Sequence, residues 1–145
     1  MDSTETKAPK AYAQWVHMVI HNDMGSGDLS VSNVKINWGK YYSWPDKDAE
    51  LATSGIAGQT IKPGGGTFEI ASCGRENSPS GCEGSFELFD GDVRVCKVYF
   101  NCPWGSKHND FDVSGTPDDY IVQAEGANMD GGAIGTVDIK VAKLG

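Results

Sequence analysis

Apolar and polar side chains alternate along this chain in short runs, the pattern of strands that bury one face. Turn residues separate nearly all of these runs, which cover residues 12–22, 29–38, 67–72, 85–90, 93–101, 119–125 and 136–141. No longer stretch carries a helical apolar stripe, and 19 glycines are scattered through the chain, so little helix is expected. The pattern predicts an all-β, single-domain β-sandwich of two mainly antiparallel sheets.

Two local signals predict how particular strands are paired. Asp90-Gly91 separates two alternating runs, and this dipeptide is typical of a tight hairpin turn, so residues 85–90 and 93–101 should be antiparallel neighbours. In residues 29–38 the apolar side chains change parity near Ser32-Asn33. A β-bulge at that point would keep them on one face.

Length and charge exclude several classes of protein. The chain has 145 residues, enough for one domain, and we expect residues 1–10 to be a flexible tail and residues 11–145 to fold. Its net charge of -8 argues against nucleic acid and against a purely electrostatic grip on anionic lipid. No apolar run approaches the roughly 18 residues of a membrane-spanning helix. Residues 1–10 also lack the apolar centre of a signal peptide.

Four cysteines, Cys73, Cys82, Cys96 and Cys102, allow three fully paired connectivities, among which the sequence does not choose. They can form two disulfides in an oxidising compartment, or they can be small buried thiols. Their spacing lacks the short pairs of zinc ribbons, so no metal site is predicted.

The most informative segment is Cys102-Pro103-Trp104-Gly105-Ser106-Lys107. It places a Trp and a Lys on a Pro- and Gly-containing loop, and Tyr99 lies in the strand that leads into it. Trp38-Gly39-Lys40 repeats this combination of ring, glycine and cation. Aromatic rings suit a membrane interface, and a Lys can pair with a headgroup phosphate, so these residues are candidates for a lipid site.

Other chemistry is less well supported. Cys102, His108 and Asp110 have the residue types of a nucleophilic site, but no activating signature surrounds the thiol, so we predict no catalytic residues, no cofactor and no enzyme. Asp46, Asp48 and Glu50 are expected to be solvated loop charges. Two alternatives stay open: a carbohydrate-binding module, because Trp and Tyr also stack on sugar rings, and a hydrolase with an unrecognised site.

Several segments together resemble the aegerolysin family and lie in the same order from residue 11 to the C-terminus. They are Ala-Tyr-Ala-Gln-Trp-Val at 11–16, Trp-Gly-Lys at 38–40, Asp-Lys-Asp-Ala-Glu at 46–50, Cys-Gly-Arg at 73–75, Cys-Pro-Trp-Gly-Ser-Lys at 102–107, Val-Ser-Gly at 113–115 and Gly-Gly-Ala-Ile-Gly at 131–135. The segment at 102–107 is the most specific of them.

The resemblance implies a small acidic β-sandwich that recognises membrane lipids, typically sphingomyelin with cholesterol or ceramide phosphoethanolamine. Family members often recruit a larger partner with a perforin-like (MACPF) domain, and the pair opens pores; some bacterial pairs are insecticidal. Members usually lack a signal peptide, so we expect release without one and peripheral binding to a target membrane. The lipid-facing candidates carried over are Trp15, Trp38, Tyr99, Trp104 and Lys107, and the Trp38-Gly39-Lys40 repeat adds Lys40. Trp15 also suits a core position.

The chain departs from the family pattern at its cysteines. Cys82 and Cys96 are additions to the more usual Cys73 and Cys102, so the comparison suggests disulfides Cys82–Cys96 and Cys73–Cys102. The loop 76–83 also differs, with Ser80 where some sphingomyelin-binding members have an acidic residue, and this difference bears on which lipid is bound.

Overall fold

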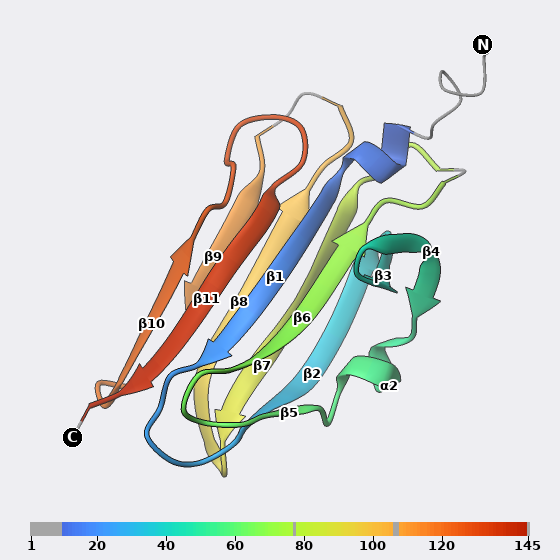
Figure 1. Ribbon diagram of the computed structural model, residues 1–145. Helices are drawn as coiled ribbons and strands as arrows, with labels where there is room; N and C mark the ends of the chain where they lie inside the picture. Colours follow the sequence, from blue (N-terminus) through green and yellow to red (C-terminus); the bar gives the residue numbers. More distant parts are fainter. Residues whose placement is uncertain (1–9, 77, 106–107, 145) are drawn as a thin grey trace.

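The computed structural model describes residues 10–76, 78–105 and 108–144, which form a sandwich of two sheets packed face to face (Figure 1). A short 3-10 helix, η1 (Lys10–Ala13), precedes the first strand. The predicted tail therefore lies outside the described residues, apart from Lys10. The two sheets confirm the predicted fold class.

The first sheet has six strands in the order β10-β11-β1-β6-β3-β4. Their bounds are β1 (Trp15–Asn22), β3 (Lys40–Ser43), β4 (Asp46–Leu51), β6 (Gly66–Cys73), β10 (Tyr120–Glu125) and β11 (Gly135–Lys143). All neighbours are antiparallel except β1 and β11, which run parallel.

The second sheet has five strands in the order β5-β2-β7-β8-β9, all of them antiparallel. Their bounds are β2 (Leu29–Trp38), β5 (Thr60–Ile61), β7 (Cys82–Asp90), β8 (Val93–Cys102) and β9 (Asp110–Ser114). A single helical turn, α2 (Thr53–Ile56), connects β4 to β5. The chain crosses between the sheets several times, for example from β1 to β2 and from β6 to β7, which brings distant parts of the sequence to the same end of the sandwich.

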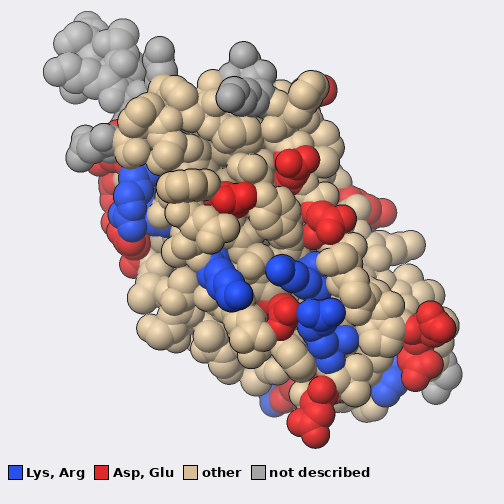
Figure 2. Space-filling model, turned by 180° about the vertical axis from the view of Figure 1, so that it is seen from behind, with Lys and Arg blue, Asp and Glu red and all other residues tan. Residues whose placement is uncertain are grey.

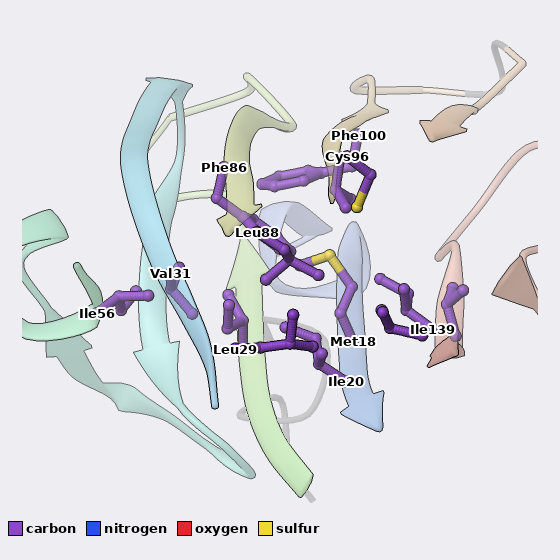
Figure 3. Packing of buried hydrophobic residues seen from close by; sticks show 14 of the residues in the cluster. Met18, Ile20, Leu29, Val31, Ile56, Phe86, Leu88, Cys96, Phe100 and Ile139 are labelled. Carbon is purple, nitrogen blue, oxygen red and sulfur yellow. The ribbon is translucent and has the colours of Figure 1, made fainter. Parts of the chain in front are cut away.

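The core lies between the inner faces of the two sheets. Leu29 and Leu88 of the second sheet point toward Met18 and Ile20 of the first (Figure 3), and all four side chains are fully buried. Burying a side chain of this size contributes roughly 2 kcal/mol, so strand alternation is a strong constraint on register.

The two local predictions are confirmed, with one shift in position. Asp90 pairs with Val93, so the two residues of the hairpin turn are Gly91 and Asp92, and Gly91 has the positive φ of 60°. The register between β2 and β7 shifts just after Ser32, where Asn33 has a φ of 51°. This irregularity is the predicted bulge.

The sequence reading missed four short strands, β3, β4, β5 and β9. The acidic segment expected to be a loop is the edge strand β4, whose charged side chains alternate outward. Charges on an edge strand discourage pairing with another chain, which is why this strand resembles a solvated loop in the sequence. No helix in the described residues is long and apolar enough to cross a membrane.

Candidate functional site

A cleft of about 470 Å³ opens at the upper end of the sandwich in Figure 1, on the side of the second sheet. We call it the Trp38–Trp104 cleft. It is lined by Trp38, Ser80, Gly81, Asn101, Pro103 and Trp104. These residues come from the end of β2, the loop before β7, the end of β8 and the loop after it.

Strand register explains why these side chains meet. Trp38 and Asn101 both lie opposite Glu83, on the two neighbours of β7. Cys82 and Cys102 are buried in the core, so Glu83 and Asn101, one position away, project to the outer face. Trp38 is 59% exposed, the largest exposure among the large hydrophobic residues that the structure describes.

The outer face of the second sheet carries most of its charged side chains over the middle and lower parts of the molecule, and few at the upper end that holds the cleft (Figure 2). No Lys or Arg in the described part of the chain lines the cleft. Its described polar groups are the Ser80 hydroxyl and the Asn101 amide. The cleft therefore combines two indole rings with neutral hydrogen-bonding groups, which suits a ligand that has an apolar part and a polar head.

The backbone at the floor of the cleft is tightly packed. A Cβ on Gly81 would lie 1.8 Å from the carbonyl oxygen of Cys102, and one on Gly39 would lie 2.4 Å from that of Cys73. Only glycine fits such approaches. Gly81 therefore brings the start of β7 against the end of β8 to form one wall of the cleft, and Gly39 holds the chain after β2 against Cys73 and Gly81.

Trp104 stands between two hollows. Besides the cleft, it lines a space of about 320 Å³ with Ala13, Gln14 and Gly105. The loop that carries it is tied down at its far end by Asn109, whose side-chain amide donates to the carbonyl oxygens of Asn128 (2.9 Å) and Gly132 (3.0 Å). Asn109 is buried, so this contact positions the Trp104 loop against the loop between β10 and β11.

Tyr99 lies below the cleft on the same outer face of β8 as Asn101. Its hydroxyl donates to the Glu83 carboxylate. Burial, with the help of this neighbouring carboxylate, raises the pKa of Tyr99 to about 12, so the phenol stays protonated. Tyr99 does not line the cleft; its hydroxyl contacts Glu83, which lies opposite Trp38 in the sheet.

Trp15 and Lys40 lie elsewhere, on the outer face of the first sheet. Trp15 packs against Trp44 with ring centroids 5.4 Å apart, and the Lys47 ammonium lies 5.3 Å from the centre of the Trp15 ring. Lys40 is buried, and its ammonium donates to the Tyr12 hydroxyl at 2.7 Å. Burial lowers the pKa of Lys40, but the hydrogen bond to Tyr12 and nearby acidic groups raise it above its usual value.

The predicted convergence is therefore only partly present. Trp38 and Trp104 meet in the cleft, Tyr99 lies beneath it, and Trp15 and Lys40 do not reach it. Lys107 lies outside the described residues. Ser80, which the family comparison linked to the choice of lipid, lines the cleft, whereas Gly81, Asn101 and Asn109 were not predicted. The sequence did contain a signal for Asn101, because a residue next to a buried strand position faces outward.

The four cysteines are buried and free, so neither predicted disulfide is present. Cys82 lies opposite Cys102, whereas Cys96 lies opposite Leu88, roughly 20 Å further along β8 at about 3.3 Å per residue. A disulfide needs Cα atoms within about 7 Å, so the Cys82–Cys96 pairing is wrong. The Cys73–Cys102 pairing is wrong because Cys73 belongs to a cluster on the outer face of the first sheet and Cys102 to the core between the sheets.

The Cys73 and Cys96 thiols should react slowly in the native protein. Burial raises the pKa of Cys73 to about 11 and that of Cys96 to about 12, so about 0.1% or less of either is thiolate at pH 8. We expect iodoacetamide to leave both unmodified at pH 8 and to label both in urea, as measured by peptide mass spectrometry. Fast labelling of either residue in the folded protein would contradict their burial.

The Cys102 thiol does not form the nucleophilic group considered from the sequence. Its Sγ lies 3.3 Å from Gln14 Oε1 and 3.2 Å from the Gly132 carbonyl oxygen, and both are acceptors. Neither His108 nor Asp110 is among these contacts. The thiol therefore helps to hold the loops at the upper end together.

Known proteins resemble this chain over nearly its whole length. Residues 13–144 match the family model described as Aegerolysin. Asp-hemolysin of Aspergillus fumigatus is 45% identical, covering 92% of this chain and 96% of that protein, and Ostreolysin A6 of Pleurotus ostreatus is 42% identical, covering 93% and 99%. The crystal structure of IP-1A from Alcaligenes faecalis superimposes with a TM-score of 0.86 at 38% identity, covering 94% of this chain and 95% of that one. The match to the family model over residues 13–144, with identities of 45% and 42% to two relatives, places the chain in the aegerolysin family.

Proposed function

We propose that this chain binds sphingolipid headgroups at a membrane surface through the Trp38–Trp104 cleft, and that it is the targeting component of a two-component cytolysin. The observation that carries the proposal is that Trp38, which is mostly exposed at the end of β2, and Trp104, which lies on a loop, line the same cleft together with neutral polar groups. Candidate lipids are sphingomyelin with cholesterol and ceramide phosphoethanolamine.

Family membership supports the general function. Aegerolysins are non-enzymatic proteins that bind membrane lipids, so this chain is a membrane-lipid-binding protein related to cytolysins. The names of its relatives, a hemolysin and an ostreolysin, indicate lysis. The exact lipid and the route to lysis are the parts that we propose here.

Physical chemistry supports the cleft as the lipid site. Indole rings favour the boundary between headgroups and acyl chains, and Trp38 exposes most of its surface at one end of a rigid sandwich. The net charge of -8 removes general attraction to anionic lipid, so the affinity has to come from ring burial and from specific contacts with a headgroup. Ser80 and Asn101 are placed to make such contacts.

The proposed division of labour between this chain and a partner rests on the family resemblance. We propose that a released, extracellular form of the chain docks on the target membrane and recruits a larger perforin-like (MACPF) protein, which opens the pore. Because the resemblance extends to bacterial insecticidal pairs, insect-cell membranes belong among the targets to be tested.

The chain alone should bind vesicles without lysing them. We expect it to sediment with sphingomyelin–cholesterol or ceramide phosphoethanolamine vesicles, but not with phosphatidylcholine vesicles, and to release no trapped dye until a perforin-like partner is added. Sedimentation and dye release are measured on the same vesicles. Dye release by the chain alone at the same dose would refute the targeting role, and equal binding to all vesicles would refute sphingolipid recognition.

A further inference from the structure

A second hollow, of about 400 Å³, lies at the side of the sandwich beside β4 and α2 (Figure 1) and shares no residue with the Trp38–Trp104 cleft. We call it the side pocket. Its polar lining and its one indole come from Tyr42, Ser43, Trp44, Gln59, Thr67 and Glu69. Neither the lipid proposal nor the family resemblance assigns it a role.

The pocket occupies a gap in the first sheet. Strand β3 pairs with β6 only as far as Ala71, while β6 continues to Gly66 and there pairs only with β1. Thr67 and Glu69 lie on this stretch of β6, whose second edge has no strand partner among the described residues. A sheet edge of this kind leaves backbone donors and acceptors available to a ligand.

Trp44 forms a rigid platform on one wall of the pocket. The His17 ring stacks on it with a centroid distance of 3.7 Å and an interplanar angle of 2°. The His17 ring is itself fixed, because Nε2 donates to Glu69 Oε2 at 2.8 Å and Nδ1 lies 3.1 Å from Thr136 Oγ1. A half-buried indole held in this way can stack on an apolar ligand face at little cost in side-chain entropy.

The pocket also holds polar groups with unused capacity. The Glu69 side chain is half exposed, and no described residue donates to its second oxygen. The Tyr42 hydroxyl is buried and has no hydrogen-bond partner in the described structure. The hydroxyl oxygen of Tyr42 has almost no accessible surface, so a ligand in the pocket does not reach it, and the neutral donors and acceptors open to a ligand are those of Ser43, Gln59 and Thr67.

These groups select one chemical class of ligand. No Lys or Arg in the described structure lines the pocket, so a phosphate or sulfate would find no counter-charge. A simple ammonium could approach Trp44 and Glu69, but it has no acceptor for the donors of Ser43, Gln59 and Thr67. A ligand with an apolar face, several hydroxyl donors and several oxygen acceptors satisfies the ring, the carboxylate and these neutral groups together.

We propose that the side pocket binds a neutral pyranose, with one face of the sugar ring on Trp44 and its hydroxyls on Glu69 and on the neutral side chains of Ser43, Gln59 and Thr67. The sugar can belong to a glycolipid headgroup or to a soluble glycan, because both present the same ring. The site is separate from the lipid cleft, so each can be lost without the other.

The test is saturation-transfer NMR with the full chain and a panel of neutral methyl glycosides in the millimolar range. We expect transfer to at least one glycoside, about tenfold weaker binding in Trp44→Ala, and unchanged binding in the control Trp104→Ala. For sphingomyelin–cholesterol vesicles we expect the opposite result: the Trp44→Ala variant should bind them normally, and the Trp104→Ala variant should bind them weakly. Glucosylceramide vesicles then separate a glycolipid source from a soluble one.

Glu69→Gln keeps the proposal testable if Trp44→Ala unfolds. The amide keeps an oxygen that can accept from His17, so the melting temperature should change little, while sugar binding falls several-fold because a charged acceptor is lost. Three results would overturn the proposal: no transfer to any neutral glycoside, equal loss in Trp104→Ala, or binding of tetramethylammonium in place of the sugars. Loss of vesicle binding alone would count against the lipid proposal and leave this one standing.

Discussion

Replacing both Trp38 and Trp104 by alanine is expected to weaken binding to sphingomyelin–cholesterol vesicles at least about a hundredfold. Each indole that enters the interface removes apolar area worth on the order of 2 kcal/mol, or roughly thirtyfold in affinity. The two rings line one cleft, so their effects need not add. Sedimentation with vesicles, or surface plasmon resonance on a captured bilayer, measures the change.

Two controls separate loss of a lipid contact from loss of stability and from the loss of any exposed apolar side chain. Because Trp38 is mostly exposed, Trp38→Ala should change the free energy of unfolding by less than about 0.5 kcal/mol. Ile121→Ala removes a 44% exposed apolar side chain from β10 and should leave vesicle binding unchanged. Wild-type affinity in the folded double variant would mean that the lipid is held elsewhere, with Trp15 on the outer face of the first sheet as the next candidate.

The sequence predicted those parts of the fold that depend on local alternation. Long strands such as β1 and β8 bury alternate side chains over most of their length, so their apolar pattern indicates both their type and the face that they bury. The short edge strands gave no such signal. Strand β4 has no fully buried position, and β5 has two residues, so only their pairing with neighbours defines them as strands.

The sequence predicted only those residues of the candidate site whose residue type and neighbours along the chain indicate a binding role. An indole on a loop with Pro103 and Gly105 is recognisable in a sequence, and Trp104 does line the cleft. Lys40 looked equivalent beside Trp38, but the chain crosses from the second sheet to the first at Gly39. Lys40 therefore points to another face, which is a fact of topology that no local motif contains.

The cysteines illustrate the same limit. Spacing along the chain could not reveal that Cys82 lies opposite Cys102, since that pairing depends on the register of the β7–β8 hairpin. Nor could it reveal that Cys73 belongs to the outer face of its sheet. Pairing the two additional cysteines with each other assumed that residues added together are close in space, and the register shows that they are not.

Gly81→Ala is expected to destabilise the protein by about 3 kcal/mol and to deform the Trp38–Trp104 cleft. The added methyl would lie 1.8 Å from the Cys102 carbonyl oxygen and 2.8 Å from the carbonyl carbons of Cys102 and Pro103. All three are backbone atoms, so no side-chain rotation relieves the clash, and the start of β7 has to move away from the end of β8. The loop that carries Trp104 begins at Pro103 and has to move with it.

The melting temperature should consequently fall by roughly 10 °C, and vesicle binding should weaken even at temperatures where the variant is fully folded. Gly25→Ala is the matched control, because a methyl at that position meets no atom within 4 Å and the backbone there is not left-handed. It should melt and bind as the unsubstituted chain does. If Gly81→Ala also melted normally, the close packing of the β7 and β8 ends would be refuted. If Gly81→Ala had a lowered melting temperature but bound vesicles normally when folded, headgroup binding would not depend on the packing of the β7 and β8 ends. The assignment of the cleft as the lipid site would then be wrong.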